Sequence, residues 1–416
     1  MGRPPRSGLR ILPHRARSIR RGAFKLDRAS RGALVCDEMG ETDSGLRAEH
    51  RKALDDEPHV VGLTFSGRGS EYFRIWVVNL ALTLVTLGVY SAWAKVRKAR
   101  YFRQNTRLDG HVFDYHGRPV AILRGRVVAF VLLTAYTWTF QFSNAAGVAT
   151  VAMVCALGPW LLMRAQQFSL ANTSYRGLRF GFRARTGEAY RTLSPVIALW
   201  LAPAVGAALT RYDLWFVGAF TLALPWMHHR IKRYQRANAS YGDSRFSFTP
   251  ALGRFYWIYA RGVGFVLLGS VLIVAIVVAM SMRRGHAEPF AASSHLETWL
   301  YGSLMGLVVY VAAGPYYAAR LQQLVWSRTR LGAIRFRTEI RAKPLFLLVV
   351  KNVALTLVTV GLYWPFATIA LARYRIECMR VESEMPLSAL AGGVQASVVS
   401  ATGEGAADAF GFDFGL

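Results

Sequence analysis

The stretch RIWVVNLALTLVTLGVYSAWAKVRKARYFRQNT, residues 74–106, passes from a long apolar run directly into a strongly basic one. Residues 75–94 carry no charge, whereas five lysines and arginines follow before Asn105. About 20 uncharged residues at 1.5 Å per residue match a hydrocarbon core roughly 30 Å thick. The stretch therefore predicts a membrane segment followed by a basic cytoplasmic flank.

Similar apolar runs recur along the chain. Of its 416 residues, 53% are hydrophobic and only 18% are charged, which is unusual for a soluble protein of this length. The further uncharged or nearly uncharged runs are 127–163, 192–210, 214–227, 262–282 and 298–319. The sequence therefore predicts an all-α polytopic membrane protein.

The net charge of +27 raises the question of nucleic-acid binding. The basic residues form short clusters directly after apolar runs, as the positive-inside bias requires, and no nucleic-acid-binding motif accompanies them. We therefore expect membrane lipids with anionic headgroups as partners at the cytoplasmic face, and no nucleic acid. Cys36, Cys155 and Cys378 lie too far apart for a disulfide framework or a cysteine metal site.

Four segments of equal length repeat along the chain. They are AWAKVRKARYFRQNTRLDGHVFDY (92–115), PWLLMRAQQFSLANTSYRGLRFGF (159–182), PWMHHRIKRYQRANASYGDSRFSF (225–248) and PYYAARLQQLVWSRTRLGAIRFRT (315–338). Matches at fixed spacing indicate a repeated module.

Five kinds of position are shared by the four segments. The first is an aromatic residue: Trp93, Trp160, Trp226 and Tyr316. The second is an arginine four residues later: Arg97, Arg164, Arg230 and Arg320. An asparagine follows after eight more residues, replaced by Arg328 in the last segment: Asn105, Asn172 and Asn238. A glycine and then a phenylalanine complete the pattern: Gly110, Gly177, Gly242 and Gly332, then Phe113, Phe180, Phe246 and Phe336.

Two interpretations of these positions stay open. In the first, they are structural: the aromatic residue lies at the membrane interface, the asparagine ends the helix in a left-handed conformation, glycine makes a turn, and the phenylalanine segment is a short cytoplasmic strand. In the second, the four arginines bind an anion or lipid headgroups, because guanidinium presents a fork of donors to phosphate.

The basic segments should all face the cytoplasm, which predicts three out-and-back pairs of spans. These six spans are 125–142 with 147–163, 193–209 with 214–228, and 261–281 with 298–318. Residues 79–90 recur almost letter for letter as residues 352–363. Gly88 and Gly361 predict a break in each, giving two short re-entrant hairpins; the alternative is two ordinary spans, eight in all.

The sequence predicts three regions. Residues 1–60 have the composition of a disordered basic tail, whose first part could precede a true start at Met39. Residues 61–385 form the membrane domain with its internal repeats. Residues 386–416 are small and polar, and we expect a second disordered tail.

The stretch TFSGRGSEYFRIWVVNLALTLVTLGVYSAWAKVRKARYFRQNTRLDGHVFDYHG resembles the YjgN family of bacterial inner-membrane proteins, which are known by a domain of unknown function. The resemblance covers roughly residues 60–385. It implies a multi-pass protein of the bacterial inner membrane and supplies no activity or ligand. The last copy departs from the pattern, with Ala370 in place of arginine and Cys378 in place of asparagine.

Signatures of enzymes are missing from the sequence. It has no phosphate-binding Gly-x-x-x-x-Gly-Lys loop and no Gly-x-Ser-x-Gly elbow, and His228 and His229 are adjacent, which makes a poor metal pair. We expect no catalytic residue, cofactor or metal. The function is then transport of a small solute or anion or, alternatively, that of a membrane scaffold that interacts with lipids. The ligand and the oligomeric state are not indicated.

Overall fold

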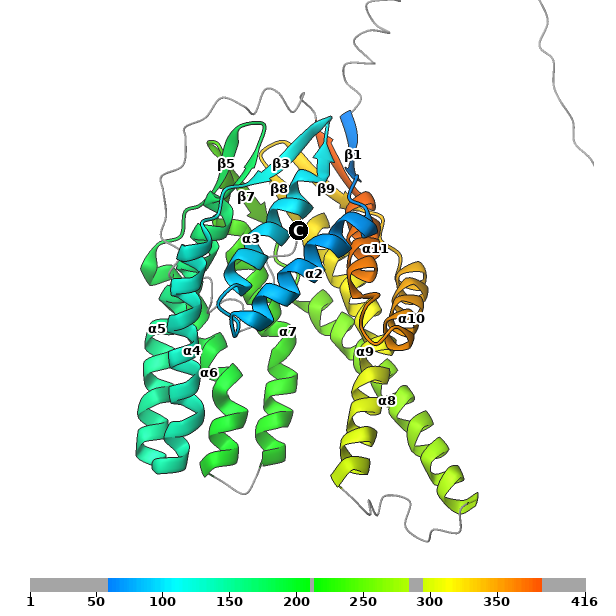
Figure 1. Ribbon diagram of the computed structural model, residues 1–416. Helices are drawn as coiled ribbons and strands as arrows, with labels where there is room; N and C mark the ends of the chain where they lie inside the picture. The colour runs from blue at the N-terminus through cyan, green and yellow to red at the C-terminus, as the bar shows by residue number, and fades with distance from the viewer. Residues whose placement is uncertain (1–58, 210–212, 284–294, 384–416) are drawn as a thin grey trace, which may run out of the picture. The chain divides into compact units, whose positions relative to one another are not determined.

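The computed structural model describes residues 59–209, 213–283 and 295–383, which are coloured in Figure 1. The tails predicted at residues 1–60 and 386–416 lie outside this part of the chain, apart from residues 59 and 60. All of the predicted site residues lie within it.

The described residues form five consecutive units with the same order of elements: strand, helix, helix, strand. The first unit contains β1 (His59–Phe65), α2 (Gly69–Val85), α3 (Ser91–Gln104) and β2 (Thr106–Leu108). The second contains β3 (His111–Tyr115), α4 (Pro119–Phe142), α5 (Asn144–Ala171) and β4 (Thr173–Tyr175). The third contains β5 (Leu178–Phe182), α6 (Thr186–Leu209), α7 (Asp213–Asn238) and β6 (Ala239–Tyr241). The fourth contains β7 (Ser244–Phe248), α8 (Leu252–Arg283), α9 (His295–Ser327) and β8 (Thr329–Leu331). The fifth contains β9 (Ile334–Thr338), α10 (Ala342–Val358), α11 (Trp364–Glu377) and β10 (Met379–Ser383).

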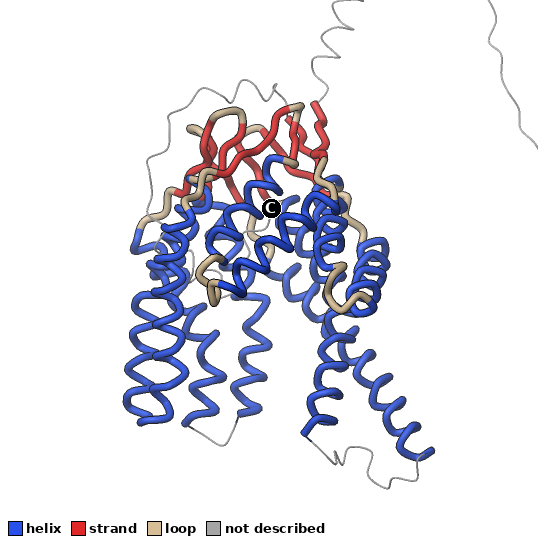
Figure 2. The backbone as a smooth tube through the Cα atoms, in the orientation of Figure 1, coloured by secondary structure: helices blue, strands red, loops and turns tan. Residues whose placement is uncertain are grey.

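The ten strands close into one antiparallel barrel in the order β1-β10-β9-β8-β7-β6-β5-β4-β3-β2. Two-residue turns join the last strand of each unit to the first strand of the next. The ring closes because β1 pairs with β2 on one side and with β10 on the other, where Val61 lies opposite Val381. Figure 2 shows all strands together at one end of the helices. Strands of three residues are too short to be stable alone, so closure supplies their hydrogen-bond partners.

The interior of the barrel is filled with side chains. One apolar cluster draws on all ten strands: Val61, Leu63, Leu108, Phe113, Tyr175, Leu178, Phe180, Ala239, Tyr241, Phe246, Leu331, Ile334, Phe336 and Val381. The hydroxyl of Tyr175 donates to the carbonyl of Leu108 at 2.8 Å, and that of Tyr241 donates to the carbonyl of Tyr175 at 2.9 Å. Burial raises the pKa of Tyr241 to about 12. The barrel is therefore a packed core, as small barrels generally are.

A second set of strand residues attaches the helices to the barrel. These residues end the first strand of units one to four and pack on helices: Phe65, Tyr115, Phe182 and Phe248. Phe255, which is fully buried in α8, packs with Phe248. These smaller cores lie outside the shared core of the barrel, and most of them combine neighbouring units, as where Phe182 of β5 shares a cluster with Leu162 of α5.

The helices also meet between the first and last units. Helix α11 packs against α2, and the rings of Phe73 and Phe366 stack with centroids 5.6 Å apart. Arg373 on α11 donates from Nη2 to the carbonyl of Gly67 at 2.8 Å. The ends of the repeated region therefore meet in the helices as well as in the barrel.

The structure contradicts the prediction of an all-α fold. Strands do occupy the phenylalanine-containing segments, but they belong to a closed barrel rather than to isolated turns. Four of the ten pairings are local hairpins, but the other six join residues more than 40 positions apart, and the β1–β10 pairing joins segments more than 300 residues apart. Strands of three residues carry too little alternation to be recognised from the sequence.

The prediction of six membrane spans is also wrong. Among the residues whose placement is described, one helical segment, Ala145–Ala171, has the length, hydropathy and low charge needed to cross a membrane. Helix α7 shows the physical reason. Its apolar part ends at Met227, before His228, His229 and Arg230, and about 14 apolar residues reach only about 21 Å, less than the hydrocarbon core.

Shortening a side chain inside the barrel should destabilise the protein. Leu331 is 5% exposed within the shared core. We expect Leu331→Ala to lower the free energy of unfolding by about 2–5 kcal/mol, because the closed ring collapses poorly around a cavity. Thermal unfolding in detergent measures the effect. Val112→Ala, at a position 43% exposed on β3, is the control and should change stability by less than about 0.5 kcal/mol. Equal effects would contradict the packed interior.

Candidate functional site

The four predicted arginines occupy equivalent places in the first four units. Each lies on the second helix of its unit, about one turn after the aromatic residue: Arg97 on α3, Arg164 on α5, Arg230 on α7 and Arg320 on α9. Pro159, Pro225 and Pro315 lie inside the last three of these helices, just before the aromatic residue.

Two of the arginines lie over tryptophan rings. The guanidinium of Arg164 is 5.6 Å from the ring centre of Trp160, and that of Arg230 is 5.1 Å from that of Trp226. Such a contact contributes about 0.5–1 kcal/mol where the cation is solvated. In the first unit, Trp93 instead stacks on Tyr90, with centroids 6.1 Å apart. The predicted aromatic positions thus hold cations in units two and three.

The other contacts of the four arginines are local. Arg164 donates to Gln167 Oε1 at 3.2 Å, and Arg320 donates to Gln323 Oε1 at 3.3 Å, in both cases three residues along the same helix. Arg230 donates from Nε to the carbonyl of Thr192 at 3.0 Å.

These bonds hold each guanidinium inside its own unit. Arg97 donates to Asn79 Oδ1 at 3.3 Å, within the first unit, and none of the contacts given above joins two of the four arginines. Arg97 and Arg320 are exposed, whereas Arg164 and Arg230 are half-buried. Each of the four arginines therefore has a polar partner in its own unit, and their role in binding an anion or lipid headgroups stays a prediction.

The three repeated asparagines end helices, but not in the left-handed conformation that we predicted. Asn105 and Asn172 both have φ of −92°. Their side-chain amides fold back instead, and Nδ2 donates to the carbonyl four residues earlier at 2.8 Å, as that of Asn238 does at 3.2 Å. The side chain thus supplies a donor to a helix-end carbonyl that lacks one within the helix.

The backbone carbonyl at the asparagine position joins the end of the second helix to the end of the first strand in each unit. This carbonyl accepts a hydrogen bond from the residue just after a first strand, in all five units: Ser66 to Asn105, His116 to Asn172, Arg183 to Asn238, Thr249 to Arg328 and Glu339 to Cys378. These bonds are 2.8–3.0 Å long. Because the acceptor is a backbone atom, arginine and cysteine can replace asparagine in the last two units.

The repeated glycines make the turns between units. Gly110 and Gly177 are each preceded by a residue that also has positive φ, Asp109 and Arg176, which is the pattern of type I′ turns. Gly242 and Gly332 take the first turn position instead, the pattern of type II′. Both types match the twist of the flanking strands, so these glycines set the strand register.

Gly88 and Gly361 lie where the first and last helix pairs reverse direction. Gly88, with φ of 93°, donates to the carbonyl of Thr83 at 2.8 Å, and Gly361, with φ of 90°, donates to that of Thr356 at 2.7 Å. At each reversal a threonine hydroxyl accepts from the backbone N–H four residues later, as Thr86 does from Tyr90 at 2.9 Å. The helix break falls at both predicted glycines.

The two helix pairs differ at one buried polar contact. Asn79 is 8% exposed, and Arg97 satisfies its side-chain oxygen. The matching Asn352 is 3% exposed, but Ala370 stands where the arginine would be. Within the described part of the chain, Asn352 Oδ1 has no hydrogen-bond donor.

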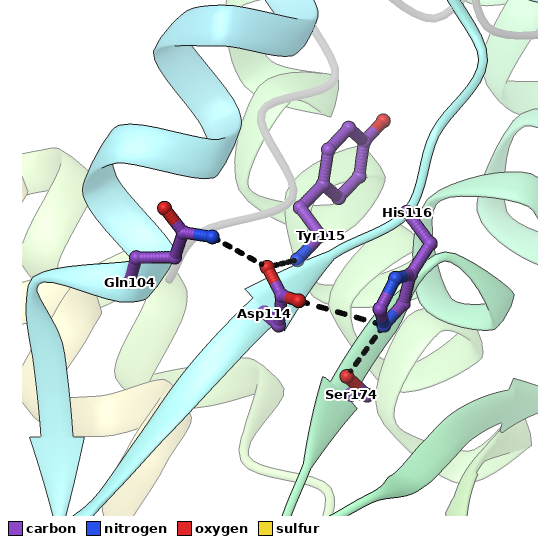
Figure 3. A network of polar contacts seen from close by, with 5 residues as sticks. All are labelled: Gln104, Asp114, Tyr115, His116 and Ser174. Carbon is purple, nitrogen blue, oxygen red and sulfur yellow. Dashed lines mark hydrogen bonds and ion pairs between the residues drawn. The ribbon is translucent and has the colours of Figure 1, made fainter.

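A serine, a histidine and an aspartate lie close together on the paired strands β3 and β4. Figure 3 shows Ser174, His116 and Asp114 with Gln104 and Tyr115. His116 Nε2 lies 2.9 Å from Ser174 Oγ and 3.9 Å from Asp114 Oδ2. A hydrolytic triad needs the carboxylate at one ring nitrogen and the serine at the other. Here the same nitrogen faces both, and Ser174 is 6% exposed, so the geometry fits a structural network.

The adjacent histidines also make packing contacts. His228 Nδ1 lies 2.9 Å from the hydroxyl of Tyr259. The imidazole rings of His228 and His229 both contact the ring of Phe255 edge-on. Among the residues that the structure describes, no group of three His, Cys, Asp or Glu side chains is placed to hold a metal ion.

Comparison with known proteins gives the family. The family model described as "Bacterial protein of unknown function (DUF898)" matches residues 61–409. The chain belongs to this family. The relative named Inner membrane protein YjgN from Salmonella typhimurium is 29% identical over 129 residues, or 31% of this chain and 33% of the relative. Its namesake from Escherichia coli (strain K12) is 31% identical over 124 residues, or 28% of this chain and 30% of the relative.

These relatives confirm the resemblance to the YjgN family and the localisation in the bacterial inner membrane. The matched part spans about a third of the curated relatives' length. No solved structure matches the chain.

Removing Arg97 should destabilise the protein, because the buried Asn79 beside it loses a hydrogen-bond donor. We expect Arg97→Ala to destabilise the protein by about 1–3 kcal/mol, because Asn79 Oδ1 loses its donor in a buried position. Thermal unfolding in detergent measures the loss, with Arg100→Ala, exposed on the same helix, as the control.

A second pair of variants tests the same explanation. Asn352→Leu should change stability little, since the native oxygen already lacks a donor and Nδ2 makes only a long bond, 3.5 Å, to the carbonyl of Ala367. Adding Asn79→Leu to Arg97→Ala should recover most of the lost stability. A lasting deficit in the double variant would contradict the role given to the Asn79–Arg97 bond.

Proposed function

We propose that this inner-membrane protein is a non-enzymatic scaffold whose helices bind anionic lipid headgroups through their basic segments. The observation that carries the proposal is that single helices change along their length from exposed apolar side chains to basic side chains. On α7, Trp215 and Leu222 are 79% and 72% exposed, and Trp226 and Arg230 follow one and two turns later. Lipid chains suit the first part, and phosphate headgroups suit the second.

Other helices support the same assignment. Phe130 on α4 is 69% exposed, and Leu268 on α8 is 71% exposed. Soluble proteins seldom leave so many large apolar side chains exposed on neighbouring helices. Arg124 and Arg126 lie nearer the barrel on α4, as Arg261 does on α8. The order apolar, then basic, then barrel thus recurs.

Two observations favour a scaffold over a carrier. Side chains from all ten strands fill the barrel, so its axis offers no route for a solute. Each of the four arginines is held within its own unit, which suits separate headgroups better than one enclosed solute. The proposed partners are therefore membrane lipids.

Lipid binding by arginine variants tests the proposal. We expect Arg97→Ala and Arg230→Ala each to weaken phosphatidylglycerol binding about fivefold, because a basic residue near an anionic surface contributes about 1 kcal/mol. Native mass spectrometry of the detergent-solubilised full chain measures the bound lipid. Arg107→Ala, exposed on β2 of the barrel, is the control.

Inorganic phosphate in the same experiment separates the two sources of a phosphate group. The scaffold proposal expects little binding of free phosphate and no competition with lipid. Unchanged lipid binding in both variants, or tight phosphate binding that either variant abolishes, would contradict it.

A further inference from the structure

The first and last helix pairs reverse direction through segments rich in exposed apolar side chains. We call residues 84–90 and 357–363 the apolar reversals, and Figure 1 shows both at the ends of their helix pairs away from the strands. Turns that face water are built mainly from Gly, Pro, Asn, Asp and Ser. Here eight large apolar side chains are between 51% and 95% exposed: Leu84, Val85, Leu87, Val89, Leu357, Val358, Val360 and Leu362.

The exposure surrounds each reversal instead of following one side of it. Leu84, Val85 and Leu87 are 67%, 80% and 95% exposed at nearly successive positions. Successive helical positions point about 100° apart, so these side chains face different directions. A groove on a partner protein or on a second copy would cover one side only. Lipid acyl chains surround a segment that is apolar on every side.

Each reversal also satisfies its own backbone donors. The N–H groups of residues 86–91 all donate within the helix pair at 2.8–3.2 Å, and those of residues 359–364 do so at 2.7–3.1 Å. The hydroxyl of Thr86 accepts from the N–H of Tyr90, and that of Thr359 has the same role in the last pair. Water could satisfy these groups in a solvated turn, whereas hydrocarbon cannot. Internal partners therefore make both reversals fit for an environment without water.

The residue before each glycine has a backbone conformation that suits other residue types better. Leu87 has φ of 49°, and Val360 has φ of 51°. The left-handed region is normally occupied by Gly, Asn or Asp, and a β-branched residue there is an outlier. In water, asparagine would suit both the backbone and the solvent at these positions. Leucine and valine are favoured where the side chain leaves water.

We propose that the two apolar reversals are anchors that insert into the hydrocarbon of one membrane leaflet without crossing the bilayer. Basic residues limit the depth. Lys351 is exposed on α10 seven residues before Val358, or about 10 Å along the helix, and Arg97 is exposed on α3 about 9 Å beyond Ser91. Half of a hydrocarbon core of roughly 30 Å is about 15 Å. The charged groups can thus stay among the headgroups while the reversals lie among acyl chains.

This inference goes beyond headgroup binding by arginine, because acyl chains hold the reversals whatever the charge of the headgroup. The two anchors belong to neighbouring helix pairs, since α11 packs against α2 and the ring of Phe73 stacks on that of Phe366. Closure of the repeated region therefore places both anchors on adjoining units.

Depth-dependent fluorescence quenching tests the insertion. Leu87→Cys and Val360→Cys are made in the full chain with its native cysteines changed to alanine, labelled with the fluorophore NBD and reconstituted into phosphatidylcholine vesicles. We expect nitroxides on the acyl chains to quench both probes strongly, and iodide on both sides of the membrane to quench them weakly. Val112→Cys, at an exposed position on β3 of the barrel, is the matched control and should show the reverse.

Two results of this experiment would overturn the inference. Iodide quenching of both probes as strong as that of the control would place the reversals in water. Protection of both probes from iodide and from the acyl-chain nitroxides would show that a protein partner or a second copy covers them.

Asparagine at the two left-handed positions gives a second readout. If the reversals lay in water, Leu87→Asn and Val360→Asn would raise the melting temperature, because asparagine tolerates this conformation. We expect a lower melting temperature in lipid nanodiscs instead, because a polar amide enters hydrocarbon. Asp109→Asn, at an exposed left-handed position in the β2–β3 turn, is the matched control and should change it little. A rise or no change in both test variants would contradict insertion.

The quenching assay also separates this inference from the lipid-binding proposal. Arg230→Ala, which should lose phosphatidylglycerol, should leave the quenching of both probes unchanged. Probes that stay in water while the arginine variants lose phosphatidylglycerol would overturn insertion alone. Inserted probes together with unchanged phosphatidylglycerol binding in those variants would overturn headgroup binding alone.

Discussion

Closure of the backbone hydrogen bonds around the barrel is the constraint on which the remaining structure depends. Four of the ten strands have only three residues, and strands that short have no independent stability. Pairing β1 with β10 removes the last free edges and brings the two ends of the repeated region together. The repeated main-chain bond to the residue after each second helix fixes where every helix pair leaves the ring.

Two kinds of apolar core stabilise the protein: the core inside the barrel, and the smaller cores between the strands and the helices. The shared core holds the units to one another, while residues such as Phe182 and Phe248 hold each helix pair to its strands. Helices of neighbouring units also pack on one another, as α5 does on α6 and α9 on α10. The first and last units, with their helix breaks at Gly88 and Gly361, have shorter helices than the middle units.

Positive charge is found at two levels of the protein. On the helices, guanidinium groups are engaged by tryptophan, glutamine and carbonyl groups, as for Arg164 and Arg230. On β7 to β10, Arg330 lies opposite Arg335, and Arg337 lies opposite Arg380, across the sheet. Arg337 and Arg380 there form ion pairs with Glu382 and Glu339.

The sequence by itself indicated the family and the inner-membrane location through its resemblance to the YjgN family. It also indicated the four repeated segments, the turn glycines and the helix breaks, because these depend on short local patterns. It misjudged the fold class, since the ladder between β1 and β10 joins residues far apart in the chain. The tertiary structure alone decided that Arg97 binds Asn79, that Arg230 binds the carbonyl of Thr192, and that Arg330 faces Arg335. Which side chains meet depends on strand register and ring closure, and no short stretch of sequence contains that information.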